Sequence, residues 1–164
     1  QDRLIPDIVR GCLGPIEEVH LRYPDAVRPW QHVLEPLGGY LSLAERLVLD
    51  PNGMDGAWNF GPLAADDQTV LKVAKSMVSM IGTGRIVVDD TLHLNESRML
   101  RLDCGKAKSE LGWSPVLTFE DAMRMTAEWY AEWIVNGNMM AFTTTQIHNF
   151  MHQLPSATHG SVAH

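Results

Sequence analysis

The sequence has two cysteines, few basic residues and no long apolar run. Cys12 and Cys104 are too few for a disulfide framework, and they lack the paired spacing of a zinc site. No stretch approaches the roughly 18 consecutive apolar residues of a membrane-spanning helix, and the first residues lack the apolar core of a secretory signal. These absences favour a reducing, cytoplasmic compartment and predict no membrane partner.

Positive charge is also scarce. The 164 residues include 13 Lys and Arg against 20 Asp and Glu, which gives a formal net charge of -7. This balance offers no basic stripe for a phosphodiester backbone, so we expect no nucleic-acid partner. It also repels small anions, and an anionic ligand would therefore need a local cluster of arginines.

The composition and the periodicity are those of a folded chain with helices and strands. Hydrophobic residues make up 45% and charged residues 20% of the chain, within the globular range. The sequence predicts helices at 4–13, 33–49, 68–81, 104–111 and 119–135, and short strands at 19–22, 57–60, 86–88 and 99–102. Helices therefore alternate with strands, as in α/β or α+β proteins. The strands are few for so many helices, which indicates that the helices pack on a sheet supplied by another polypeptide segment.

Two motifs of nicotinamide-dependent enzymes are missing. A dinucleotide fingerprint needs three glycines at fixed offsets, but after Gly82 and Gly84 the third position holds Val87. Short-chain dehydrogenases pair a tyrosine with a lysine four residues later, and none of the three tyrosines has a lysine there. We therefore assign no catalytic residue and no cofactor-binding residue.

His148 and His152 are spaced by four residues, which would let them share a metal ion on a helix. They lie next to a polar terminus, however, and two solvated histidines on a fraying helix end are the simpler interpretation. No metal site is assigned.

The most distinctive string is Arg-Pro-Trp-Gln-His-Val at 28–33, at the start of the second helical segment. Arg28 can clamp a phosphate with two parallel hydrogen bonds, while Pro29 fixes the approach of the chain and Trp30 supplies packing. The alternative that composition alone favours is a surface arginine next to a core tryptophan.

Further strings accompany it: Asp-Arg-Leu-Ile-Pro-Asp at 2–7, Ala-Trp-Asn-Phe-Gly-Pro at 57–62, and Leu-Asp-Cys-Gly-Lys at 102–106 followed by Leu-Gly-Trp-Ser-Pro at 111–115. Together these strings resemble the extended short-chain dehydrogenase/reductase family of nucleotide-sugar enzymes, and within it the CDP-glucose 4,6-dehydratase branch. The resemblance runs in order from residue 1 to about residue 150, and it covers only the C-terminal half of such enzymes. It implies an α/β fold, with the end of a Rossmann sheet and a small α+β substrate-binding lobe.

The resemblance also implies a set of nucleotide-sugar-binding residues. Arg28 would bind the substrate diphosphate, segment 3–6 would line the nucleotide, and strand 20–22 would lie beside the base. Asn59 would lie in a turn near the site, and Arg98 near a second phosphate contact. The implied substrate-binding residues are Arg3, Leu4, Ile5, Pro6, Arg22, Arg28, Asn59 and Arg98.

In the family that the chain resembles, bound NAD oxidises the sugar at C4, water is eliminated across C5 and C6, and the hydride returns to C6. The C4 ketone makes this possible because it acidifies the C5 proton. The groups that perform these steps belong to the N-terminal half of the family, and this chain contains none of them. We therefore expect residues 1–150 to be a nucleotide-sugar-binding lobe with terminal Rossmann elements that is not catalytically complete and does not bind NAD tightly alone. Residues 151–164 are expected to be a disordered polar tail.

Two other functions stay open. The chain could be a truncated homologue that holds a nucleotide without chemistry, or an assembly module. The helical segments 33–49 and 68–81 would normally cover a Rossmann sheet, and without it their apolar faces need another partner. This predicts a homo-oligomer, or association with another chain through these helix faces.

Overall fold

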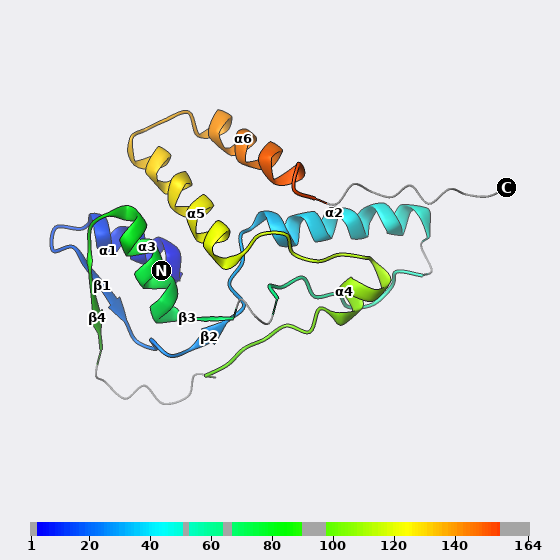
Figure 1. Ribbon diagram of the computed structural model, residues 1–164, viewed down its shortest axis with the longest axis horizontal. Helices are drawn as coiled ribbons and strands as arrows, with labels where there is room; N and C mark the ends of the chain where they lie inside the picture. The colour runs from blue at the N-terminus through cyan, green and yellow to red at the C-terminus, as the bar shows by residue number, and fades with distance from the viewer. Residues whose placement is uncertain (1–2, 51–52, 64–66, 90–97, 155–164) are drawn as a thin grey trace.

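The computed structural model describes residues 3–50, 53–63, 67–89 and 98–154 (Figure 1). Its elements in chain order are α1 (Leu4–Leu13), β1 (Glu18–Leu21), β2 (Val27–Arg28), α2 (Leu34–Leu49), β3 (Gln68–Thr69), α3 (Val70–Ile81), β4 (Arg85–Val88), α4 (Gly105–Glu110), α5 (Phe119–Ile134) and α6 (Met139–Met151). They form two groups. In one, α1 and α3 pack on the strand pair β1 and β4, and α5 packs on α3; in the other, α2 and α4 lie along extended segments.

The strand pair β1 and β4 is parallel and is covered by helices on one face. Its register pairs Glu18 with Arg85, and the side chains of these two residues form an ion pair. Because side chains alternate along a strand, Val19 and Leu21 point to one face, where both are buried, while Glu18 and His20 belong to the opposite face. The buried face receives the main core.

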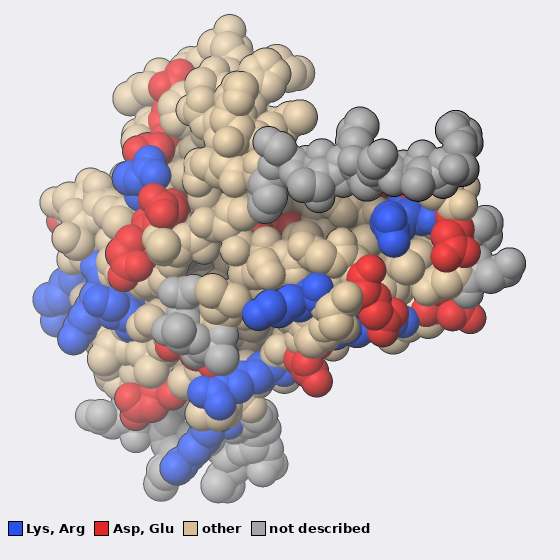
Figure 2. Space-filling view, turned by 45° about the vertical axis from the view of Figure 1, so that its right-hand side comes forward, with Lys and Arg blue, Asp and Glu red and all other residues tan. Residues whose placement is uncertain are grey.

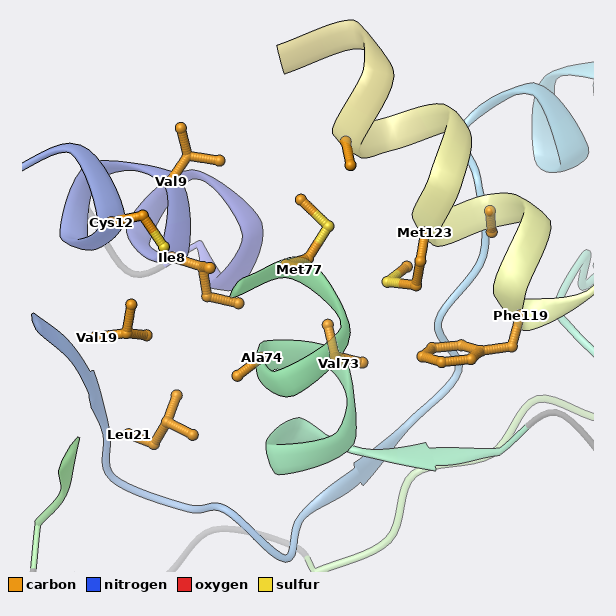
Figure 3. Packing of buried hydrophobic residues seen from close by; sticks show 12 residues of the cluster. Ile8, Val9, Cys12, Val19, Leu21, Val73, Ala74, Met77, Phe119 and Met123 are labelled. Carbon is orange, nitrogen blue, oxygen red and sulfur yellow. The ribbon is translucent and has the colours of Figure 1, made fainter. Parts of the chain in front are cut away.

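Helix α3 lies at the centre of that core (Figure 3). Val73, Ala74 and Met77 recur at three- and four-residue spacing, and all three are fully buried. The helix packs against α1 and β1 and also against α5. Burial of each such valine or methionine side chain contributes about 1.5 to 3 kcal/mol. The core residues are Ile8, Val9, Cys12, Val19, Leu21, Val73, Ala74, Met77, Phe119, Ala122, Met123 and Ala127.

Local signals fix both ends of α3. At its start, the side chain of Thr69 accepts a hydrogen bond from the backbone N–H of Lys72 at 3.2 Å, which satisfies one of the otherwise unpaired helix donors. At its end, Gly82 adopts a φ of +87°, a left-handed conformation that glycine takes without strain.

The apolar face of this segment was expected to need an outside partner; that prediction is wrong, because α1, β1 and α5 cover the face within the chain.

A smaller core joins α2, α4 and the extended segment 57–61. Phe60 is its central ring, in edge-to-face contact with Tyr40 at a centroid distance of 5.4 Å and with Trp113 at 5.0 Å. Ala107 of α4 is fully buried beside them. Gly39 of α2 faces the same ring, and a Cβ atom there would lie only 2.3 Å from Cδ1 of Phe60. The absence of a side chain at Gly39 therefore lets α2 approach the ring.

Helix α6 folds back along α5 (Figure 1). The side chain of Asn138 caps its start by accepting a hydrogen bond from the backbone N–H of Ala141 at 3.1 Å. The buried Gln146 donates from Nε2 to the backbone carbonyl oxygen of Met125 at 2.8 Å. Phe150 is buried against Met125. These contacts tie the C-terminal helix to α5.

The structure confirms most of the predicted elements. The helices predicted at 4–13, 33–49, 104–111 and 119–135 are α1, α2, α4 and α5 with ends shifted by one or two residues at most, and the strands at 19–22 and 86–88 are β1 and β4. The predicted helix 68–81 is α3 except for its first two residues, which form β3.

Two strand predictions are wrong within the described structure. Segment 57–60 is extended, but no described strand pairs with it, and segment 99–102 contributes only a single bridge from Met99 to Val27. The sequence did not predict β2, β3 or α6. Of the expected tail, Met151 ends α6 and Leu154 packs near Phe150, while 155–164 lie outside the described residues.

Adjacent glycines of α2 give a sharp test of this packing. Gly39→Ala should lower the free energy of unfolding by about 1 to 3 kcal/mol, because the added methyl group overlaps the buried ring of Phe60. Gly38→Ala is the matched control: its Cβ would lie 3.5 Å from Cε1 of Phe150, an ordinary contact, and alanine is favoured over glycine in a helix by about 1 kcal/mol. Urea unfolding of both variants measures the difference. Equal stability of the two would contradict the close approach of Phe60.

Candidate functional site

A pocket of about 760 Å³ lies between the start of α1, the end of β1 and the segment that leads from β2 into α2. Six of the eight residues predicted to bind substrate line it: Arg3, Leu4, Ile5, Pro6, Arg22 and Arg28. They come from three separate stretches of sequence, which the packing of α1 against β1 brings together. We call this hollow the arginine pocket.

The arginine pocket carries a local surplus of positive charge. Among the described residues that line it, Arg3, Arg22 and Arg28 are basic and Asp7 is acidic. The chain as a whole has a net charge of -7, and on the face shown in Figure 2 basic and acidic side chains are interspersed in small groups. The pocket therefore meets the condition set by the composition, a local arginine cluster in an acidic protein, and suits an anionic ligand.

The segment 28–31 makes one hydrogen bond to the adjacent Val27 and one to the distant Gln68. Arg28 is half-buried, and its Nη1 donates to the carbonyl oxygen of Val27 at 2.9 Å. The indole N–H of Trp30 donates to the carbonyl oxygen of Gln68 at 3.0 Å. The bond of Trp30 ties the segment after Pro29 to β3 and so helps to position this wall of the pocket.

The first turn of α1 forms the opposite wall. Arg3 is the residue before the helix, and Asp7 accepts a hydrogen bond from its backbone N–H at 3.0 Å. The other oxygen of Asp7 pairs with Arg10. Because Asp7 is already engaged by both groups, it opposes an incoming anion less than an unpaired carboxylate would.

Asn59 and Arg98 do not line the arginine pocket. Nδ2 of Asn59 donates to the carbonyl oxygen of Asp103 at 3.0 Å, which links the two extended segments of the smaller core. The carbonyl oxygen of Arg98 accepts from the backbone N–H of Val27 at 2.9 Å, beside β2. The substrate contacts that the resemblance implies for these two residues stay predictions.

The pocket also includes residues that the sequence did not assign to it. Tyr23, Trp30 and Gln31 line it, with Asp7 from α1. Tyr23 directly follows Arg22, and Gln31 lies three residues after Arg28, so proximity in sequence to a predicted contact was the available signal. A phenol, an indole and an amide add stacking surface and hydrogen-bonding groups to the three cations.

A second cavity of about 270 Å³ lies next to the first, and Ile5 and Gln31 line both. Trp129 and Tyr130 of α5 and Ile147 of α6 give it a mainly apolar wall. The indole N–H of Trp129 is already bonded to the hydroxyl of Thr143 at 3.0 Å. Among the described residues that line this cavity, none is Lys, Arg, Asp or Glu, in contrast to the arginine pocket.

Across the part of the chain that the structure describes, no group of three or more His, Cys, Asp or Glu residues is placed to hold a metal ion. His148 lies near the end of α6 and His152 directly follows that helix. None of the helices in the described ranges is long and apolar enough to cross a membrane.

His32, which follows Gln31, is buried and lines the second cavity. It is 9% exposed, and its Nδ1 accepts a hydrogen bond from the backbone N–H of Leu34 at 3.4 Å. Burial lowers the pKa of this imidazole below its ordinary value of 6.5, because the charged ring would lose its hydration. The folded protein therefore holds His32 neutral at pH 7.

The buried neutral ring of His32 makes stability depend on pH. Because the folded pKa is lowered, the unfolded chain binds the proton first, so stability is complete above about pH 6.5 and declines as the pH falls toward the folded pKa. His32→Asn keeps an acceptor for Leu34 and should lose this dependence. The difference between the unfolding free energies of the two proteins should change by at most about 1.4 kcal/mol per pH unit. Urea titrations from pH 5 to about pH 8 measure it, and parallel curves would refute the assignment.

No family model matches the chain. The chain is 37% identical over 152 residues to CDP-glucose 4,6-dehydratase from Salmonella typhimurium, a match that covers 92% of the chain and 42% of that enzyme. A shorter match, 45% identical over 42 residues, is to dTDP-glucose 4,6-dehydratase of the same organism and covers 24% of the chain and 12% of that enzyme. The chain therefore spans less than half of the length of these relatives.

Two solved structures share the fold. The structure of dTDP-glucose 4,6-dehydratase from Bacillus anthracis in complex with NAD matches 80% of the chain and 40% of its own length, with a TM-score of 0.61 and 24% identity. UDP-glucose 4-epimerase from Bifidobacterium longum in complex with NAD+ and UDP matches 79% and 39%, with a TM-score of 0.61 and 21% identity.

The fold and these matches make the chain similar to nucleotide-sugar 4,6-dehydratases over nearly its whole length. This confirms the predicted α/β fold class. In particular, the chain is a relative of CDP-glucose 4,6-dehydratase and matches 42% of the length of that enzyme.

Proposed function

We propose that the chain binds a nucleotide sugar, CDP-glucose or a close analogue, in the arginine pocket. We propose further that it is the substrate-binding part of an NAD-dependent 4,6-dehydratase. The observation that carries this proposal is the convergence of Arg3, Arg22 and Arg28 in one pocket. Identity of 37% to CDP-glucose 4,6-dehydratase over nearly the whole chain supports the choice of nucleotide sugar.

The chemistry of the pocket matches the parts of such a ligand. A nucleotide sugar carries two negative charges on its diphosphate, and Arg28 can meet them with parallel hydrogen bonds at a fixed position. The apolar side chains of Leu4, Ile5 and Pro6 offer a wall for the nucleoside, and Tyr23 offers an aromatic face. The volume of about 760 Å³ lies within the usual range of ligand pockets.

The described residues do not fit NAD, the group that both structural neighbours hold. A dinucleotide site needs a glycine-rich turn between a strand and a helix, so that the backbone can approach the pyrophosphate. Here β3 runs directly into α3 with no residue between them, and β1 leads into Arg22, Tyr23 and Pro24. We derive no redox step in this chain, and we propose that the NAD-binding half of the reaction requires another polypeptide segment.

Arg28→Ala is the variant that tests the proposed ligand. Loss of a hydrogen bond to a charged group costs about 1.5 to 3 kcal/mol, so CDP-glucose affinity should fall about 10- to 100-fold. Calorimetric titration of the 164-residue chain with CDP-glucose measures this change. Arg46→Ala, at the exposed end of α2 and outside the pocket, is the control and should bind as the unchanged chain does.

Arg98→Ala tests whether the ligand is confined to the arginine pocket or also makes the second phosphate contact that the resemblance implies for Arg98. The residue lies outside the arginine pocket, so its loss should change affinity by less than about threefold. A loss as large as that of Arg28→Ala would show that the ligand extends beyond the pocket. Absence of CDP-glucose binding by the unchanged chain would overturn the proposed function itself.

A second candidate function is assembly through the exposed apolar side of α2. Leu37, Tyr40, Leu41 and Val48 of this helix are 44% to 82% exposed. Contiguous apolar surface of this kind is uncommon on a monomer and marks association surfaces. We propose that α2 pairs with a second copy of the chain or with the polypeptide that carries the redox half.

Light scattering tests the association. The double variant Leu41→Lys with Val48→Lys should lower the apparent mass, because it places two charges on the α2 surface. Met140→Lys, on the exposed side of α6, is the control and should leave the mass unchanged. A monodisperse monomer of the unchanged chain at high concentration would contradict self-association.

A further inference from the structure

Two buried oxygen atoms close to the arginine pocket lack a hydrogen-bond donor among the protein atoms of the described residues. They are Oε1 of Gln31, in the segment before α2, and Oε2 of Glu35, in the first turn of α2. Glu35 is 2% exposed, so its carboxyl group is removed from solvent. A buried acceptor without a donor costs about 1 to 3 kcal/mol, and more when it carries charge.

Neither side chain can turn its oxygen toward another partner. Nε2 of Gln31 donates to the carbonyl oxygen of Phe60 at 2.7 Å. Oε1 of Glu35 accepts from the backbone N–H groups of Val116 and Leu117, at 2.8 and 2.6 Å. Rotation of either side chain would break these bonds, so a donor has to come to the oxygens.

Both residues line one small cavity, which has a volume of about 10 Å³. That volume is close to the minimum that holds a single water molecule, and it is too small for a lysine or arginine side chain. A water molecule has two hydrogen atoms and can therefore serve two acceptors at once.

His32 gives the cavity a third polar group. It lines the same cavity, and its Nδ1 accepts a hydrogen bond from the backbone N–H of Leu34. A neutral ring that accepts at Nδ1 carries its proton on Nε2, which makes it a donor. Buried waters make about three hydrogen bonds on average, so we expect Nε2 of His32 to provide the third.

We propose that Gln31 and Glu35 hold one buried water molecule, which donates a hydrogen bond to each of their two otherwise unpaired oxygens. The bound water links the wall of the arginine pocket to the loop at Val116 and Leu117 that leads into α5. The inference does not depend on the identity of the ligand.

A crystal structure of the 164-residue chain without ligand tests the water directly. The expected result is one solvent oxygen within about 3.2 Å of both Oε1 of Gln31 and Oε2 of Glu35. Two outcomes would overturn the proposal. One is a cavity without solvent density. The other is direct contact between the two oxygens at about 2.5 to 2.8 Å, which would mean that they share a proton instead.

Water-to-protein magnetisation transfer by NMR gives the same test in solution. The backbone N–H of Leu117 should show a cross-peak from a long-lived water molecule, and Gln31→Met should weaken that cross-peak at least tenfold because it removes one acceptor. Gln146→Met is the matched control: Gln146 is also buried and donates to a backbone carbonyl, but it does not line this cavity. Loss of the cross-peak in both variants, or its persistence in Gln31→Met, would refute the shared water. If Gln31→Met does not fold, the cross-peak in the unchanged chain still decides the question.

Discussion

Burial of α3 is the constraint on which the arrangement of this chain depends. Val73, Ala74 and Met77 are fully enclosed by α1 and β1 and by α5 (Figure 3), so one short helix sets the spacing of its neighbours. The start of α1 and the end of β1 form two of the walls of the arginine pocket. Val70, from the first turn of α3, also lines the pocket. The position of the cationic side chains therefore follows from the packing of apolar ones.

The pocket shows how an acidic protein can accept an anion. Three guanidinium groups come from the residue before α1, the residue after β1 and the end of β2, so the cluster exists only in the folded chain. A net charge of -7 disfavours approach of an anion from a distance, and the local surplus acts at short range, where its effect is least screened. Binding strength in such a pocket depends on geometry more than on the overall charge.

Sequence periodicity predicted the helices well because each helix satisfies its own backbone and needs only one apolar face. It predicted strands less well because a strand needs a partner: 57–60 has the composition of a strand, but its edges meet no other strand in the described residues. Helix α6 was missed because Thr143, Thr144 and Thr145 interrupt its apolar pattern.

The prediction that Arg3, Arg22 and Arg28 lie in one site came from the resemblance to known enzymes, since no local pattern joins residues so far apart. The buried oxygens of Gln31 and Glu35 could not be foreseen, because burial of a polar group is a property of the packed chain.

The short stretch from Trp30 to Glu35 has a consequence for how the molecule comes apart. Its side chains bond to Gln68, Phe60, Val116 and Leu117, residues 29 to 82 positions away along the chain. These bonds connect the start of α2 with β3, with the smaller core and with the loop that leads into α5. The two groups should therefore lose amide protection together in hydrogen exchange, as one cooperative unit, although each has a hydrophobic cluster of its own.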